Sequence, residues 1–120
     1  MNGRVAVYIP SYSDGGVEKN MVVLASGFAE LGVPTDFLVP PGDDLPHMQR
    51  LSPKVRVIRL SADRSAQLAQ TADYLRRERP VVLMSAKGKD DRQALAARDL
   101  AGVETRIFIR CGIHLSSRPK

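Results

Sequence analysis

The sequence predicts a single α/β domain with a Rossmann-like, doubly wound fold, in which helices cover both faces of a five-stranded parallel sheet of order 3-2-1-4-5. Three observations predict it. Short apolar runs rich in β-branched residues alternate with stretches of helical periodicity. Several of these runs are apolar at consecutive positions, which is typical of strands buried on both faces. At 120 residues, 43% of them hydrophobic, the chain can form one domain with a modest core.

Five apolar runs are predicted to be strands. They are 5–9 (VAVYI), 35–39 (TDFLV), 55–60 (VRVIRL), 81–86 (VVLMSA) and 106–110 (RIFIR). The third run carries Arg56 and Arg59 where an inner strand would be more uniformly apolar, so we expect it at an edge of the sheet.

Three stretches between these runs have the spacing and the end signals of helices. They are 17–31, 63–78 and 91–101. The first stops at Gly32, the second begins near Asp63, and the third is followed by Gly102.

Shorter features complete the connections. A short helix is predicted between the second and third strands, over 45–51, with His47 at its surface. The acidic pairs Asp43–Asp44 and Asp90–Asp91 are most simply helix caps, with Asp91 at the start of the last helix.

The charge balance favours anionic partners. Eighteen Lys and Arg residues against thirteen Asp and Glu give a formal net charge of +5. This charge suits phosphates or anionic lipid head groups without selecting between them, and a solvated basic surface is the simpler explanation. Aromatic residues make up only 5% of the chain and do not alternate with the basic ones, which argues against nucleic acid as a partner.

The only cysteine, Cys111, excludes an internal disulfide and a cysteine-rich zinc site. We therefore expect a reducing compartment, with the cytoplasm as the default. His47 and His114 are too widely separated to predict a metal site, so neither a metal nor a cofactor is expected. The apolar runs are too short for a signal-peptide core or a membrane span.

Two adjacent glycines, Gly15 and Gly16, lie between the first strand and the first helix. Glycine permits positive φ and a close approach of the backbone to a ligand, and the free N–H groups at a helix start favour a phosphate. The pair therefore indicates an anion site, and a tight turn with no ligand is the alternative. The loop matches neither G-x-G-x-x-G nor a Walker A motif, which disfavours ordinary dinucleotide binding.

In a sheet of this order, ligands bind at the carboxyl edge, where the strand order reverses between the first and fourth strands. The predicted crevice lies between 11–16 and 85–89. Ser85 and Lys87 follow the fourth strand and are candidates for contacts with an acceptor or a phosphate, although a solvated loop explains them equally well.

The segment VAVYIPSYSDGGVEKNMVVLASGFAELGVPTDFLV resembles the start of retaining GT-B glycosyltransferases of family 4, also called glycosyl transferases group 1. In that family a first strand runs into a GGVE loop, a long helix closed by L-x-x-x-G, and a second strand. The resemblance continues through LSPKVRVIRL and ARDLAGVETRIFIRCGIH, and so spans Val5 to His114.

The resemblance implies that residues 1–120 are the N-terminal, acceptor-side half of such an enzyme. Gly15 and Gly16 would contact the diphosphate of a nucleotide-sugar donor, and His114 would match a catalytic histidine beside the transferred sugar. Family members hold most of the donor in a second, C-terminal domain with an E-x7-E motif, and this chain has no pair of glutamates at that spacing. The chain by itself is therefore expected to be inactive.

The partners implied are a nucleotide-sugar donor, a glycan or lipid-linked acceptor, and the missing C-terminal domain. A weak contact with an anionic membrane surface is a further expectation, through Arg50, Lys54, Arg56 and Arg59. The protein would then be cytoplasmic, with a peripheral position at the inner membrane surface. The alternative is a non-enzymatic α/β module that binds a phosphorylated ligand or docks a partner.

Overall fold

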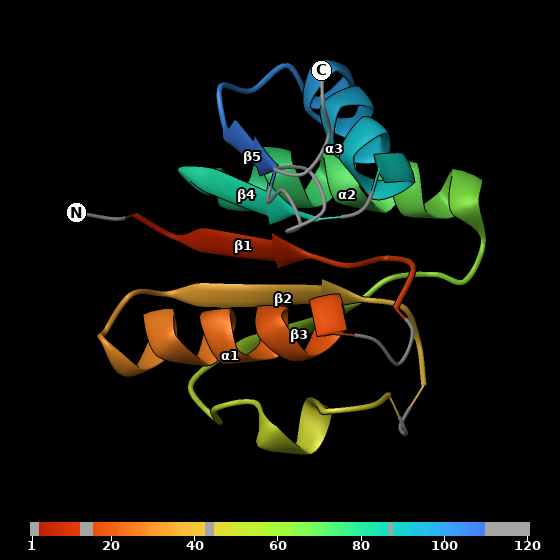
Figure 1. Ribbon diagram of the computed structural model, residues 1–120. Coiled ribbons are helices and arrows are strands. Elements are labelled where there is room, and N and C mark those ends of the chain that lie inside the picture. Colours follow the sequence, from red (N-terminus) through yellow and green to blue (C-terminus); the bar gives the residue numbers. More distant parts are fainter. Residues whose placement is uncertain (1–2, 13–15, 43–44, 87, 110–120) are drawn as a thin grey trace, which may run out of the picture.

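The computed structural model describes residues 3–12, 16–42, 45–86 and 88–109. Five parallel strands form one sheet of order β3-β2-β1-β4-β5, which confirms the predicted topology (Figure 1). The strands are β1 (Val5–Tyr8), β2 (Thr35–Val39), β3 (Arg56–Arg59), β4 (Val82–Ser85) and β5 (Arg106–Ile109).

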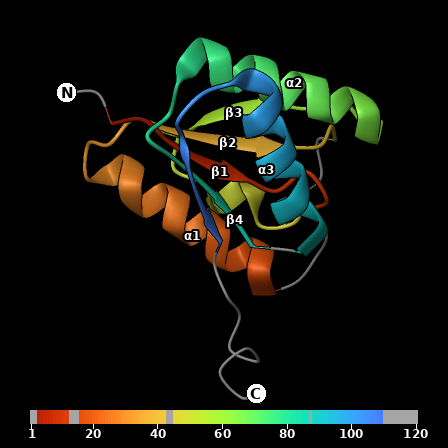
Figure 2. The same cartoon turned by 90° about the horizontal axis from the view of Figure 1, so that it is seen from above.

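Helices cover both faces of the sheet, as a doubly wound fold requires. The helices are α1 (Gly16–Glu30), α2 (Arg64–Glu78) and α3 (Gly88–Ala101), with a short 3-10 turn, η1 (Met48–Arg50). Viewed from above, α1 lies on one side of the sheet and α2 and α3 lie on the other (Figure 2). No helix within the described ranges is long and apolar enough to cross a membrane.

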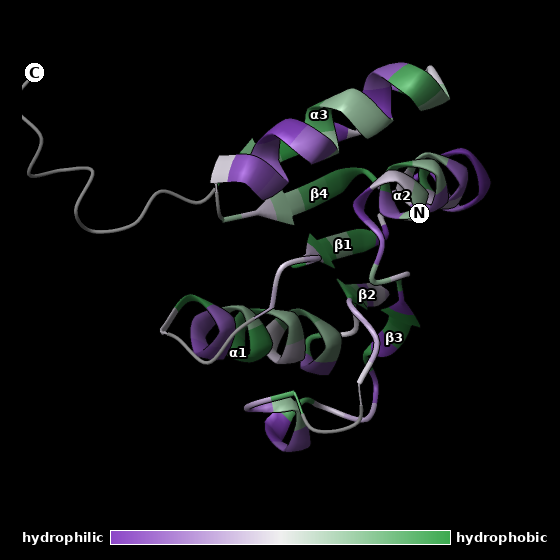
Figure 3. Ribbon diagram, turned by 90° about the vertical axis from the view of Figure 1, so that its right-hand side faces the viewer, coloured by the Kyte–Doolittle hydropathy of each residue, from purple (hydrophilic) through white to green (hydrophobic). Residues whose placement is uncertain are grey.

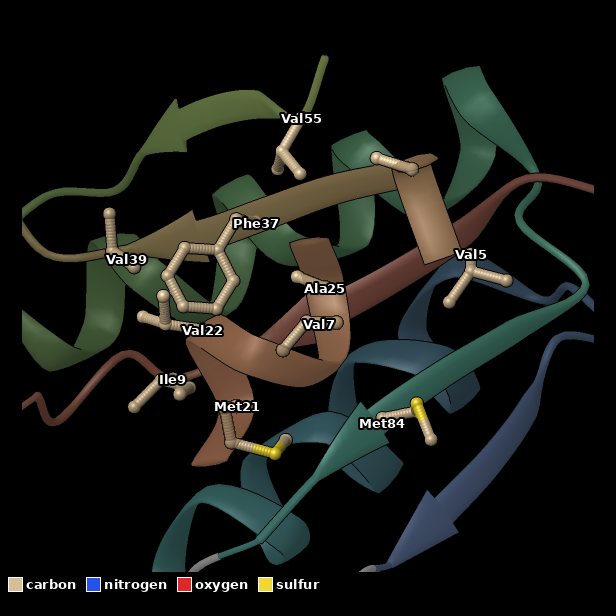
Figure 4. Close-up of a cluster of buried hydrophobic side chains, with 11 residues drawn as sticks. Val5, Val7, Ile9, Met21, Val22, Ala25, Phe37, Val39, Val55 and Met84 are labelled. Carbon is tan, nitrogen blue, oxygen red and sulfur yellow. The ribbon is translucent and has the colours of Figure 1, made fainter. Parts of the chain in front are cut away.

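The core consists of two layers because side chains alternate between the faces of a strand. Val5 and Val7 on β1 point toward α1, where they meet Met21 and Ala25, as the close-up in Figure 4 shows. Ala6 and Tyr8 point the other way, into the cluster built with α2 and α3. All four residues of β1 are buried, and β1 and β4 are hydrophobic along most of their length (Figure 3).

Two predicted helix ends are confirmed, each at a residue that favours a helix terminus. Gly32 ends α1 with a φ of 91°, a left-handed conformation that glycine adopts at low cost. Asp63 caps α2 because its side chain accepts a hydrogen bond from the backbone N–H of Ala66 at 3.0 Å. The prediction for 45–51 is reduced to the single turn η1, which begins after His47.

The start of α3 corrects the sequence interpretation. This helix begins at Gly88 rather than 91, so Asp90 and Asp91 lie inside its first turn instead of capping it from outside. Their side chains reach other elements, as described below. The pair Asp43–Asp44 lies outside the described residues.

The edge position of β3 is confirmed, and its arginines have different roles. Arg56 and Arg59 are exposed at the edge, as the charged pattern predicts. Arg59 donates to the carbonyl oxygen of Gly42 at 2.6 Å. Arg56 instead lies opposite Asp36 in the register of β2 and β3 and binds its buried carboxylate.

That carboxylate belongs to Asp36, which is fully buried at the amino edge of the sheet. Arg56 donates to both of its oxygens at 2.9 Å, and Arg4 donates to Oδ1 at 2.9 Å. Tyr74 of α2 donates its hydroxyl to Oδ2 at 2.6 Å. Glu78 of α2 pairs with both arginines, at 3.6 Å from Arg4 and 3.1 Å from Arg56. One buried charge therefore joins the segment before β1 to β2, β3 and α2.

Burial keeps two tyrosines in their neutral form, Tyr74 beside Asp36 and Tyr8 beside Thr71 and Gln93. Burial, together with the hydrogen bond to Asp36, raises the pKa of Tyr74 far above its ordinary value of 10.0. Burial also raises the pKa of Tyr8, against the opposing effect of its hydrogen bonds to Thr71 and Gln93. Both phenols remain protonated in the folded protein at pH values where an unfolded tyrosine ionises.

Replacing Asp36→Asn should lower the free energy of unfolding by about 2–4 kcal/mol, because it leaves two arginines and Tyr74 without their shared acceptor charge. The matched control is Asp73→Asn on α2, whose side chain is 70% exposed and whose ion pairs among the described residues are with Arg76 and Arg77 on the same helix. That change should cost no more than about 0.5 kcal/mol. Urea denaturation of the three proteins measures both values, and similar losses in the two variants would contradict the assignment.

Stability should fall as the pH rises above about 10. An unfolded tyrosine loses its proton there, whereas Tyr74 keeps its proton in the folded state, so each further pH unit favours unfolding by up to about 1.4 kcal/mol. The Tyr74→Phe variant should be less stable at pH 8, because it loses a hydrogen bond, yet its stability should decline less steeply between pH 10 and about 11.5. Urea denaturation across this pH range tests the slope, and parallel curves for the two proteins would refute the explanation.

Candidate functional site

The strand order reverses between β1 and β4, so the carboxyl ends of these two strands define the candidate site. Each strand leads through a loop into a helix, β1 into α1 and β4 into α3. The amino ends of both helices therefore face this edge of the sheet (Figure 1). Helix amino ends carry free N–H groups and a partial positive charge, which together favour an anion at the crevice.

The first turn of α3 holds the two sides of this crevice together. Asp90 is 1% exposed, and its Oδ2 accepts from the hydroxyl of Ser11, in the loop after β1, at 2.7 Å. Its Oδ1 accepts from Arg64, the first residue of α2, at 3.3 Å. The next residue, Asp91, accepts from the hydroxyl of Ser85 at the end of β4, at 2.5 Å. Three elements are thus fastened to one helical turn.

A buried polar network lies behind this turn, between β1, α2 and α3. Gln93 donates to the hydroxyl of Tyr8 at 2.7 Å and to Oε1 of Gln67 at 3.2 Å. Since Thr71 donates its hydroxyl to the backbone carbonyl of Gln67, the 2.9 Å bond between Tyr8 and Thr71 must have tyrosine as the donor. Gln67 also donates to the carbonyl of Pro10 in the loop after β1, at 3.3 Å. These hydrogen bonds hold β1, the loop after it, α2 and α3 in fixed positions behind the candidate site.

Gly16 is the first residue of α1 and is exposed to solvent. Its φ lies outside the left-handed region, which corrects the idea that this glycine is needed for a positive φ. A Cβ atom added at Gly16 would meet no described atom within 4 Å beyond its chain neighbours and the backbone of its own helix, so the space toward the rest of the described chain is open. The predicted close approach of a ligand stays a prediction. Gly15, Lys87, His114 and Cys111 lie outside the described residues.

Ser85 has a structural partner. The residue is fully buried, and its hydroxyl donates to Asp91. Donation from Ser85 to a phosphate, one of the contacts that the sequence predicts, would require this bond to break, because the hydroxyl has a single proton. The observed geometry makes Ser85 the anchor of the first turn of α3 at the end of β4.

Two features of the site were not identified as such from the sequence. The sequence predicts Asp90 and Asp91 only as caps, because acidic residues are common near helix starts. Glu18, in the GGVE segment, is only 1% exposed although it lies in the first turn of α1. A carboxylate is seldom so buried unless it is paired or hydrogen-bonded, so Glu18 has a structural role inside the protein at the start of α1. A glutamate two residues after a glycine pair is the signal that could have identified it.

The basic surface predicted from Arg50, Lys54, Arg56 and Arg59 is partly balanced within the fold. Lys54 lies 3.4 Å from a carboxylate oxygen of Glu30, and Arg56 is bound to Asp36. Two of the four positive charges therefore have acidic partners nearby. Among the described residues, no group of three or more His, Cys, Asp or Glu side chains is placed to hold a metal ion.

An open hollow of about 350 Å³ lies at the opposite edge of the sheet, where β4 and β5 begin. It is lined by Arg79, Pro80, Val81, Val103, Glu104, Thr105 and Arg106. Ligands of open α/β sheets bind outside the carboxyl ends of the strands, so the candidate site remains at the β1–β4 edge.

No family model matches the sequence, and no curated protein is similar enough in sequence to count as a relative. Among solved structures, the apo form of the lipopolysaccharide outer core galactosyltransferase WaaB superposes on this chain with a TM-score of 0.66. The match covers 92% of this chain and 33% of that chain, at 13% sequence identity. The chain therefore has the Rossmann-like fold found in a glycosyltransferase and spans about a third of that enzyme's length.

Proposed function

We propose that this chain is the acceptor-side half of a retaining GT-B glycosyltransferase. Joined to a donor-binding half, it would transfer a sugar from a nucleotide-diphosphate sugar to an acceptor. The observation that carries the proposal is the two-glycine loop, which leads from β1 into the exposed start of α1 where the strand order reverses. The fold similarity to a galactosyltransferase supports it.

The chemistry assigned to this half is positioning and electrostatic stabilisation. As the bond between the sugar and the diphosphate breaks, negative charge grows on the leaving diphosphate. The backbone amides of Gly15 and Gly16, with the positive end of α1, would stabilise that charge. Lys19 is exposed in the first turn of α1 and would add a positive charge close to the same place. His114 would contact the reacting sugar and orient it.

The acceptor would approach from the β4 side of the crevice, where Lys87 is the proposed contact. Lys89 and Arg92 are exposed at the start of α3 and would favour an acceptor that carries negative charge, such as a lipid-linked phosphate. A weak contact with an anionic membrane surface, through Arg50 and Arg59, would suit such an acceptor. A cytoplasmic location belongs to the same proposal.

The chain alone should not catalyse multiple turnovers, because most contacts with the donor sugar and nucleotide are assigned to the other half. The test incubates it with UDP-glucose, UDP-galactose and GDP-mannose and a set of glycan and lipid-linked acceptors. Clear multi-turnover transfer by this chain would overturn the half-enzyme proposal. A gene with no second α/β half carrying E-x7-E after Lys120 would favour a non-enzymatic module that binds a phosphorylated ligand.

Replacing Gly16→Val should lower kcat/KM of the complete enzyme by about tenfold or more, because the new side chain fills the open space assigned to the diphosphate. Gly27→Val is the matched control, since Gly27 is also exposed on α1 and its added Cβ would also meet no atom within 4 Å. Valine has a higher helix propensity than glycine in a helix interior, so the control should keep or slightly gain helix stability and should keep its transfer rate. Thermal melting confirms that both variants are folded at the assay temperature. Equal transfer rates in the parent and the Gly16→Val variant would contradict the proposal that this turn contacts the diphosphate.

A further inference from the structure

The last strand of the sheet, β5, has an open edge that carries apolar side chains. Among the described strands it pairs with β4 alone, so its other side faces outward (Figure 1). Phe108 is 52% exposed and Ile109 is 41% exposed. At the opposite edge of the sheet, both exposed residues of β3 are arginines, Arg56 and Arg59. Charged residues protect an edge strand from further pairing, whereas an apolar edge favours it.

The backbone of β5 presents hydrogen-bonding groups on this outer side. The N–H of Arg106 donates to the carbonyl of Val81 at 3.1 Å, so it points toward β4. Because the direction of the backbone groups alternates along a strand, those of Phe108 also point toward β4. The backbone groups of Ile107 and Ile109 point outward, where no described strand lies. One more strand can therefore pair with β5 without breaking any bond to β4.

The two exposed apolar side chains of β5 lie on opposite faces of the sheet. Ile107 packs in the cluster formed with α2 and α3, so Ile109, two residues later, lies on that face. Phe108 lies on the α1 face, beside Met84 in the register of β4 and β5. α1 packs mainly against β2 and η1, toward the other edge of the sheet. A strand beside β5 would therefore cover apolar surface on both faces.

The connection to such a strand would run over a defined face. β4, α3 and β5 form one parallel crossover unit, with α3 on the same face as α2. Crossovers between parallel strands are right-handed in nearly all proteins, so a parallel strand beyond β5 takes its connection over the face of α3. That connection would cover Ile109, and side chains of the new strand would pack beside Phe108 on the other face.

The neighbour of β5 could be a second copy of the chain or the continuation of the same chain, and the observations favour the continuation. A second copy placed by a two-fold axis would pair antiparallel, in a sheet whose described pairs are all parallel. Two copies with a net charge of +5 each would also repel each other. Consecutive strands of one chain are usually neighbours. The superposition with the galactosyltransferase covers 33% of that chain, so this fold occurs there within a longer polypeptide.

We propose that β5 is an inner strand of the complete protein, and that a segment beyond residue 120 adds a sixth parallel strand to its outer edge. A parallel neighbour needs a connection of about a dozen residues or more before its own strand begins, and residues 110–120 are too few for both. The proposal rests on the proposed function, because it assumes the longer enzyme of which this chain is one part. It identifies the β5 edge as the surface on which the following segment is attached.

The experiment compares amide hydrogen exchange in this chain and in the complete enzyme at three residues of β5. Phe108 is the internal control, because its N–H points toward β4. In the chain alone, Ile107 and Ile109 should exchange fast and Phe108 slowly. In the complete enzyme, Ile107 and Ile109 should exchange at least about a hundredfold more slowly than in the chain alone, because their N–H groups then belong to a strand pair.

Lysine substitutions test the apolar cover over the same edge. Val23→Lys is the matched control for Phe108→Lys, since Val23 is 62% exposed on α1 and lies outside β5. In the chain alone, both changes should shift the melting temperature by less than about 2 °C. In the complete enzyme, Phe108→Lys should lower it by at least about 4 °C more than Val23→Lys, because the new charge would be buried beside the sixth strand. Equal shifts in the complete enzyme would contradict the proposal.

Ile109→Pro tests the backbone pairing. Proline removes only an N–H that points outward, so the melting temperature of the chain alone should stay within about 2 °C of the parent value. In the complete enzyme the same change should speed exchange at Ile107 by about tenfold or more, because the strand pair is interrupted next to it. Unchanged exchange at Ile107 would count against the sixth strand.

Fast exchange at Ile107 and Ile109 in the complete enzyme would overturn the sixth strand, even if that enzyme transfers sugar. Slow exchange there in an enzyme that transfers no sugar would support the strand and contradict the proposed function. Slow exchange already in the chain alone would overturn the assignment to a segment beyond residue 120, and its dependence on protein concentration would identify a second copy instead. A gene that encodes no residues after Lys120 would contradict both proposals.

Discussion

The buried carboxylate of Asp36 joins parts of the chain that apolar packing alone would leave loosely oriented. Hydrophobic burial is non-directional and sets which faces meet, without fixing how the segments at a sheet edge are placed. A buried charge is different, because each hydrogen bond to it has a defined direction and its loss is costly. Since Arg4, Arg56 and Tyr74 all donate to Asp36, this one group fixes how the segment before β1, β3 and α2 meet β2 at the amino edge of the sheet.

The two edges of the sheet are fastened by different polar contacts. The amino edge is held by Asp36 with its arginines, and it faces away from the crevice where the strand order reverses. At the carboxyl edge, Asp90 and Asp91 bind hydroxyl groups from the ends of β1 and β4. The first turn of α3 thus connects both walls of the candidate site through two short, partly buried hydrogen bonds.

The distribution of charge also separates these edges. Arg56, which the sequence places on a basic surface, is largely committed to Asp36 and Glu78. Near the crevice, Asp90 and Glu18 are buried, whereas Lys19 and Lys89 are exposed. Among the described residues of this edge, these two carboxylates therefore point into the interior and the two lysines face solvent, which favours an anionic ligand at the helix amino ends.

The amino-acid sequence by itself determined the elements, their order and several of their ends. The alternation of apolar runs and helical periods predicted all five strands and the edge position of β3, and Gly32 and Asp63 marked a helix end and a helix start. These features are encoded within a few neighbouring residues, where periodicity, capping and backbone freedom operate. Only the tertiary structure decided that α3 begins at Gly88, that Gly16 needs no positive φ, and that Asp36 and Asp90 are buried with partners far along the chain. Those outcomes depend on which strands lie side by side and which way their side chains point, and no local pattern records a contact between residues 79 positions apart.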